Sequence, residues 1–160
     1  MLRRCQLQDI ESIYIVINDA AKAYRGVIPP DCYHEPYMSI DELSEEMQKM
    51  SFFGWQDEKQ LVGVMGFQRV RDVTLIRHAY VLTAWQRQGI GSQLVNYLRK
   101  LSETRRLLVG TWADAHWAIA FYQKHGFHLL ADKDKLLRAY WRVSDRQIEV
   151  SVVLGLDLSW

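Results

Sequence analysis

Two glycines separated by one residue mark the segment of this chain best suited to hold an anionic ligand. The segment covers residues 86–92, Gln-Arg-Gln-Gly-Ile-Gly-Ser, between an apolar run and a stretch with helical spacing. Glycine lets the backbone turn tightly and come close to a ligand. The first turn of a helix also presents unpaired N–H groups and a partial positive charge. Together with the side chain of Arg87, these features predict a diphosphate site.

Other anion sites share this logic. A nucleotide P-loop would end in Gly-Lys-Ser/Thr, and this chain has no such ending. A dinucleotide fingerprint would place a third glycine at position 94, where the chain has Leu94. On spacing alone, a glycine-rich turn that binds nothing also stays open.

A second motif lies downstream, and the pair resembles one known family. The sequence Gln86-Arg-Gln-Gly-Ile-Gly91 is similar to the pattern Gln/Arg-x-x-Gly-x-Gly/Ala of the GNAT superfamily of N-acetyltransferases. Residues 118–127, Ala-Ile-Ala-Phe-Tyr-Gln-Lys-His-Gly-Phe, resemble that family's Ala-Ile-x-Phe/Leu-Tyr-x-Lys-x-Gly-Phe signature. The two motifs occur in the family's order. The resemblance covers residues 52–130 well and the first fifty residues by element order.

The resemblance implies acetyl-coenzyme A as cofactor and assigns parts of its site. The backbone of Val81 and Leu82 would pair with the pantetheine arm, as an added strand does. The amides of the glycine turn would cradle the diphosphate, and the sheet would splay between its fourth and fifth strands to leave a slot. The implied cofactor-binding residues are Val81, Leu82, Gln86, Arg87, Gln88, Gly89, Ile90, Gly91, Ser92 and Tyr122.

Acetyl transfer needs a base for an ammonium whose pKa is near 10.4, and an acid for the departing thiolate. Tyr122 is the candidate acid, because the resemblance places its phenol near the thioester sulfur; core packing is the other interpretation. His78 is a candidate base on the strand before the glycine turn. Strict alternation sets it on the face opposite Arg77, unless a bulge shifts the register. Asp114 is a further catalytic candidate, with helix capping as its other interpretation, and a water chain without a dedicated base stays open.

The acceptor amine is expected between the early helices and the later strands, as in the family that the chain resembles. Residues 33–37 offer aromatics, a histidine and a carboxylate, and acids at positions 41, 42, 45 and 46 add negative charge. A solvated helix face is the other interpretation of those acids. Trp112, Tyr140 and Trp141 could wall the pocket or fill the core. The acceptor is expected to be a small molecule or a peptide amine.

An alternative function from another class is a non-catalytic acetyl-coenzyme A sensor or interaction module. Two features favour it: the strand at residues 74–80 has no carboxylate, and position 115 is Ala115 where the family often has Asn.

These motifs need a framework to position them, and the patterns predict an α/β (α+β) fold. We expect a GNAT-like mixed, mostly antiparallel central sheet of six or seven strands, flanked by about four helices. Helices are predicted over residues 9–24, 40–50, 89–103 and 115–124, the first two capped by Asp9 and by Ser39. Strands are predicted over residues 52–56, 61–69, 73–82, 107–112, 127–130 and 148–156, with a weak one at 2–7.

Length and charge limit the other classes of protein to which the chain could belong. The 160 residues suit one N-acetyltransferase domain over 1–160, and a formal net charge of +1 argues against nucleic-acid binding. No apolar run is long enough for a membrane span, and the two cysteines fit no metal spacing. With no secretory signal, a cytoplasmic setting is expected. The alternating terminal strand and its apolar end, Leu156, Leu158 and Trp160, predict pairing with a second copy as a homodimer.

Overall fold

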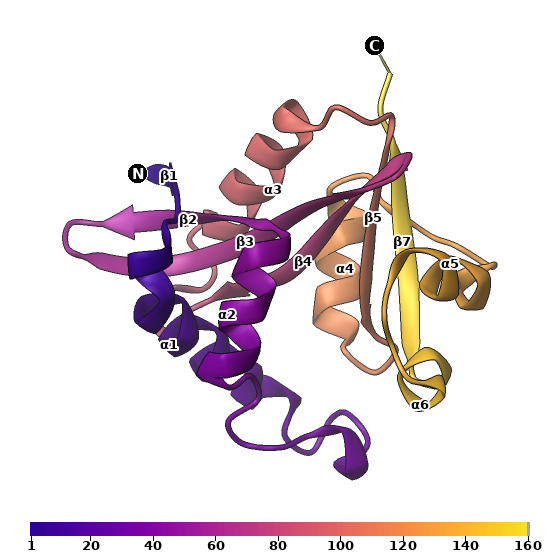
Figure 1. Ribbon diagram of the computed structural model, residues 1–160, viewed down its shortest axis with the longest axis horizontal. Helices are drawn as coiled ribbons and strands as arrows, with labels where there is room; N and C mark the ends of the chain where they lie inside the picture. Colours follow the sequence, from indigo (N-terminus) through magenta and orange to yellow (C-terminus); the bar gives the residue numbers. More distant parts are fainter. Residues whose placement is uncertain (160) are drawn as a thin grey trace.

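The computed structural model describes residues 1–159, which contain one seven-stranded sheet. Its strands lie in the spatial order β1-β2-β3-β4-β5-β7-β6 (Figure 1). Every neighbouring pair is antiparallel except β4 and β5, which run parallel. The strand bounds are β1 Leu2–Arg4, β2 Ser51–Asp57, β3 Gln60–Val70, β4 Val73–Val81, β5 Arg106–Trp112, β6 His128–Leu129 and β7 Ser151–Asp157. The prediction of a mixed, mostly antiparallel sheet is confirmed.

Six helices flank the sheet. Figure 1 shows α3 and α4 on one face, and α1, α2, α5 and α6 on the other. Their bounds are α1 Ile10–Ala20, α2 Ile40–Lys49, α3 Ile90–Leu101, α4 His116–Lys124, α5 Lys133–Tyr140 and α6 Asp145–Glu149. No helix within residues 1–159 combines the length and apolar character needed to cross a membrane.

The last two helices were not predicted, and they correct the start of the terminal strand. The hydroxyl of Ser144 accepts a hydrogen bond from the Gln147 amide at 3.1 Å and so caps α6. Ile148, expected in the strand, lies in this helix and is buried against α5. Strand β7 therefore begins three residues later, at Ser151.

Of the two predicted caps, one forms and one does not. Ser39 accepts a hydrogen bond from the Glu42 amide at 3.1 Å, and α2 begins at Ile40 as expected. The carboxylate of Asp9 instead accepts two hydrogen bonds from Arg3, both at 2.9 Å. The start of α1 therefore has no side-chain cap. Asp9 ties the helix to the first strand, because an arginine fork offers a stronger, charge-assisted partner than an amide.

The sheet is buried on both faces, which changes the pattern expected for β7. Val153 and Leu154, adjacent in the strand, are both fully buried. Val153 packs in a cluster with α5 and α6, whereas Leu154 packs in the main core together with Leu94 and Leu98 of α3. Simple alternation between a buried and an exposed face therefore fails here, as it does for strands covered on both sides.

The terminal strand is also not a free edge. Strand β7 pairs with β5 along its whole length and with the short β6 on its other side. Leu156 and Leu158 pack against the main core, and Trp160 lies outside the described residues. The edge on which the homodimer prediction relied is therefore partly occupied by β6 within the chain, and the homodimer itself stays a prediction.

The packing of α3 generates a stability prediction. Leu94 is fully buried, whereas Leu101 on the same helix is 37% exposed. Replacing Leu94 with alanine should lower the free energy of unfolding by about 2–5 kcal/mol, through lost apolar burial and a residual cavity. Urea denaturation monitored by circular dichroism measures this loss. Leu101→Ala is the matched control and should cost much less; equal losses would contradict the assigned core.

Candidate active site

The site begins where two parallel strands part. Residues Val73–Ile76 of β4 pair with Arg106–Val109 of β5, and the pairing stops there although both strands continue. Beyond this point the two strands enclose a slot, as expected from the sequence. Unpaired strand groups in such a slot need partners, since buried backbone N–H and C=O groups are costly when left free.

A large cleft of about 780 Å³ begins at the end of β4, where Ala79, Tyr80 and Val81 line it, and extends over the glycine turn. Eight of the ten predicted cofactor-binding residues line it: Val81, Gln86, Arg87, Gly89, Ile90, Gly91, Ser92 and Tyr122. Leu82 and Gln88 lie outside its lining. Leu82 is also fully engaged within the chain, because its N–H donates to Val62 and its C=O accepts from Trp85. Both backbone groups of Leu82 thus already have a partner within the chain, and its role toward the cofactor stays a prediction.

The backbone N–H and C=O of Val81, unlike those of Leu82, point toward the slot. Since Leu82 bonds to Val62 across the ladder, antiparallel alternation turns the N–H and C=O of Val81 away from β3 and toward the slot. The C=O of Val81 accepts a hydrogen bond from the Gln86 side chain at 3.0 Å. This bond fixes the start of the turn relative to the end of β4.

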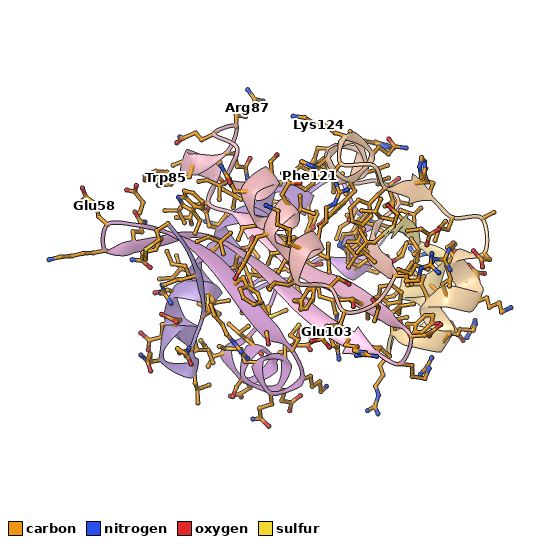
Figure 2. The ribbon with its side chains drawn as sticks, turned by 90° about the horizontal axis from the view of Figure 1, so that it is seen from above. Glu58, Trp85, Arg87, Glu103, Phe121 and Lys124 are labelled. Carbon is orange, nitrogen blue, oxygen red and sulfur yellow. The ribbon has the colours of Figure 1, made fainter. Side chains whose placement is uncertain are left out.

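The turn itself uses two left-handed residues, Arg87 at φ 67° and Gly89 at φ 81°. Gly89 is the N-cap of α3, so the first amides of the helix face the cleft without a capping side chain. A Cβ on Gly91 would lie 3.2 Å from the Phe121 ring, so the helix start and α4 approach closely here. Figure 2 shows Arg87 and Lys124 projecting at the same edge, with Phe121 between them and deeper in the molecule. Both cations line the cleft, which gives it a positive mouth.

Tyr122 lies on α4, with its ring packed between Phe121 at 5.1 Å and Phe127 at 5.4 Å. The side chain is buried yet lines the cleft. Burial raises the pKa of the Tyr122 phenol well above its ordinary value, so the group keeps its proton at neutral pH. The position of Tyr122 is therefore compatible with both interpretations, core packing and a general acid, because the packed ring also lines the cleft.

A bulge in β4 changes the position of His78. The ladder between β3 and β4 shifts register between Val64 and Gly66, and His78 adopts a left-handed φ of 54°. As a result, both Arg77 and His78 reach Glu46 of α2. Strict alternation would have put these neighbours on opposite faces. Such conformations are uncommon for residues other than glycine and tend to occur at functional sites.

Glu46, Arg77 and His78 form a half-buried charged group on the α2 side of the sheet. The Glu46 carboxylate lies 3.4 Å from the Arg77 guanidinium and 3.5 Å from His78 Nε2. Burial lowers the pKa of His78, with Glu46 opposing that effect and Arg77 adding to it. Burial alone would raise the pKa of Glu46, but His78 and Arg77 hold it below its ordinary value. At neutral pH the group contains an ion pair and a neutral imidazole.

A second cavity, of about 170 Å³, lies where β4 and β5 have parted: Arg77 and His78 line it from β4, and Gly110, Thr111 and Trp112 line it from β5. Tyr24 and Tyr80 line both this cavity and the large cleft. Their hydroxyl oxygens are 3.4 Å apart, so the pair stands where the two spaces meet. Burial raises the pKa of both phenols, which remain neutral.

Asp114 does not join either space. It is exposed, lines neither cavity, and makes no side-chain hydrogen bond to residues 1–159. Helix α4 begins after Ala115 without a side-chain cap, so Asp114 does not replace the missing capping group either. The capping role expected for Asp114 is therefore wrong, and its catalytic role stays a prediction that its exposed position does not support.

Two site residues, Tyr24 and Tyr80, were not singled out in the sequence, and Glu46 was named only as one of four acids expected near the acceptor. Glu46 follows the buried Leu43 by three positions and so falls on the inner face of α2, which was a usable signal. Tyr24 ends the 3-10 turn Ala21–Tyr24 beyond α1, and Tyr80 follows the bulge. No local sequence pattern indicates that Tyr24 or Tyr80 lies at the site.

Comparisons with known proteins agree with this architecture. A family model described as acetyltransferase (GNAT) family matches residues 13–127. The PaiA N-acetyltransferase of Thermoplasma acidophilum, solved in complex with coenzyme A, is 15% identical over 98% of each chain with a TM-score of 0.76. The ribosomal-protein-S18-alanine N-acetyltransferase of Escherichia coli is 17% identical over 100% of this chain and 94% of that one, with a TM-score of 0.71. A Bacillus subtilis acetyltransferase in complex with CoA is 23% identical over 99% and 98%, with a TM-score of 0.68. At these identities the solved structures share the fold.

The charged group generates a titration prediction. His78 should titrate below the ordinary histidine pKa of about 6.5, and Glu46→Gln should lower its pKa further, because the carboxylate favours the imidazolium. Ring-proton NMR across pH 4–9 measures both values. The control is Glu45→Gln on the exposed side of α2, which should leave the titration unchanged. A His78 pKa that rises in Glu46→Gln would contradict the assigned contact.

Proposed function

The chain belongs to the acetyltransferase (GNAT) family, and we propose that it transfers an acetyl group from acetyl-coenzyme A to a primary amine by direct attack on the thioester. The observation that carries the proposal is the cleft of about 780 Å³ that joins an uncapped helix start to the end of β4, beyond the last pair of that strand with β5. Residues 1–160 would form a single domain, and the one continuous sheet supports this. The free thiols of Cys5 and Cys32 are in keeping with the reducing cytoplasm as the setting.

The residues of the cleft fit coenzyme A in charge and shape. Amides at the start of α3 would bind the diphosphate, with Arg87 and Lys124 adding positive charge. The N–H and C=O of Val81 would pair with the amides of the pantetheine arm, as an added strand does. Gly91 leaves room for the diphosphate, since any side chain there would point at Phe121 and the cleft.

The reaction also needs two proton movements. Acetyl-coenzyme A supplies an activated acyl group and a thiolate that must gain a proton. The phenol Oη of Tyr122 would donate that proton, and its raised pKa keeps the proton in place until the thiolate forms. Neutral His78 would accept a proton from the ammonium at Nδ1, because Nε2 is enclosed beside Glu46. The acceptor would enter through the second cavity and reach the thioester between Tyr24 and Tyr80.

The cofactor site is tested with Gly91→Glu. The new carboxylate would stand against the diphosphate, and like charges 4 Å apart repel by about 4 kcal/mol at an effective dielectric constant near 20. Coenzyme A affinity measured by calorimetry should therefore fall well over tenfold. Asn96→Glu adds the same charge to the exposed side of α3 and should keep wild-type affinity. Equal affinities in the wild type and Gly91→Glu would reject the assigned site.

The acid is tested with Tyr122→Phe, which keeps the ring and removes the proton. A general acid contributes about 100- to 10,000-fold in rate, so single-turnover transfer to an acceptor amine should slow by that order. Coenzyme A affinity and melting temperature should change little, because the hydroxyl makes no hydrogen bond to residues 1–159. Single-turnover measurement avoids masking by product release. A wild-type rate would leave Tyr122 with a packing role alone.

A further inference from the structure

The wall of the second cavity carries positive charge and no negative charge. Arg77 is the one cationic side chain that lines it, and no Asp or Glu is among its lining residues. Glu46 pairs with Arg77 from behind and lies outside the lining. An acceptor with a second ammonium would therefore meet a guanidinium and find no carboxylate. The wall instead favours a ligand with an anionic group.

Arg77 also has hydrogen-bonding capacity to spare. Its contacts to Glu46 measure 3.4 and 3.5 Å and its contact to Gln68 measures 3.2 Å. Charge-assisted hydrogen bonds between arginine and carboxylate are normally 2.7–2.9 Å, so the two contacts to Glu46 are long. A guanidinium carries five N–H donors, and its side chain here is 23% exposed. It can therefore bind an incoming carboxylate without giving up Glu46.

The other charged groups of the surrounding loops are paired, or, like Arg142 and Asp114, are exposed and lie outside the lining of the cavity. Arg25 bonds with Glu35, and Arg146 holds Asp31 through contacts of 2.9 and 3.1 Å. The acids that the sequence suggested for a cationic substrate are thus neutralised or turned to solvent. Arg77 remains the cation that faces the cavity.

The cavity also has an aromatic wall that suits an ammonium group. The Tyr24 ring lies 5.2 Å from Tyr37, 6.3 Å from Tyr80 and 6.4 Å from Trp112, measured between ring centres. Aromatic faces within about 6 Å attract a cation, and the neutral phenol oxygens can accept its N–H groups. This aromatic cluster also borders the large cleft, where the thioester would lie.

From these contacts we infer that the acceptor is a small amino acid, whose carboxylate binds Arg77 while its amine lies against the aromatic cluster of Tyr24, Tyr37, Tyr80 and Trp112. The inference rests on the proposed function and narrows its substrate. A cavity of about 150 Å³ holds one benzene molecule. The volume of about 170 Å³ therefore suits a single small side chain, for which Leu137, Trp141 and Val143 form an apolar wall.

The test compares amino acids with their own amides, such as leucine with leucinamide and methionine with methioninamide. The amide keeps the side chain and removes the carboxylate. The wild-type enzyme should prefer the acid in kcat/KM for acetyl transfer, and Arg77→Gln should reduce the ratio of acid to amide by about 10- to 100-fold. Arg77→Lys should lie between them, since it keeps the charge and loses the fork. Differences in intrinsic amine reactivity cancel when this ratio is compared between variants.

Controls separate recognition from folding. Arg69→Gln removes an exposed arginine of β3 that pairs with Glu103 and should leave the ratio unchanged. Because Arg77→Gln leaves Glu46 without its partner, the double variant Arg77→Gln with Glu46→Gln repeats the test without an unpaired buried charge. An unchanged ratio in both Arg77 variants would overturn the inference. So would a wild-type preference for diamines, or for the N-terminus of a peptide over the free amino acid.

Failure of this inference can be told apart from failure of the proposed function. Coenzyme A binding together with thiol release driven by amides or diamines would keep the acetyl transfer and reject the amino acid. Absence of both coenzyme A binding and amine-dependent thiol release would reject the transfer itself.

Discussion

The parting of β4 from β5 is the constraint on which the rest of this molecule depends. Two parallel strands that pair through Ile76 and Val109 and then separate leave backbone groups without ladder partners. Such groups must find partners elsewhere, or the sheet loses stability. The chain supplies some of them itself, as when the Gln86 side chain donates to the C=O of Val81. What remains is a strand edge inside the protein, open to a ligand with amide groups of its own.

The neighbouring features make sense as support for that opening. The bulge at His78 lies just beyond the last pair with β5, where β4 no longer has to keep register on that side. Because of the bulge, Arg77 and His78 both reach Glu46, so α2 is tied to the parted strand by charge as well as by packing. On the other face, α3 and α4 close together over the slot, and the absence of a side chain at Gly91 allows their approach. Each element thus holds one wall of an opening that the sheet alone would not keep.

Much of this could be predicted from the sequence, and the exceptions have physical causes. The turn before α3 and the helix after it carry strong local signals, namely paired glycines and a regular apolar stripe ending in buried residues such as Leu98. The bulge was a stated condition for His78 and has no local marker, since it arises from the pairing of two distant strands. Helices α5 and α6 are short, and their apolar residues face a strand buried on both sides, so residues near Ile148 had the composition of a strand. Long-range packing also decided Glu46 and Tyr80, whose partners lie more than thirty residues away in the chain.

The position of Tyr24 has a consequence for how such a molecule can diversify. Together with Tyr80, this residue at the end of a 3-10 turn stands between two spaces, one lined by α3 and α4 and the other by α5 and α6. Two reactants would therefore approach from different sides, and neither would have to wait for the other to clear its path. Strands β4, β5 and β7 supply more than half of the residues that line the smaller space. The remaining wall includes Tyr37, Leu137, Trp141, Val143 and Gln147, from segments that contribute nothing to the glycine turn. Substitutions there can accumulate without disturbing the opposite face, so a lineage can exchange one reactant for another while the machinery it shares with its relatives stays constant.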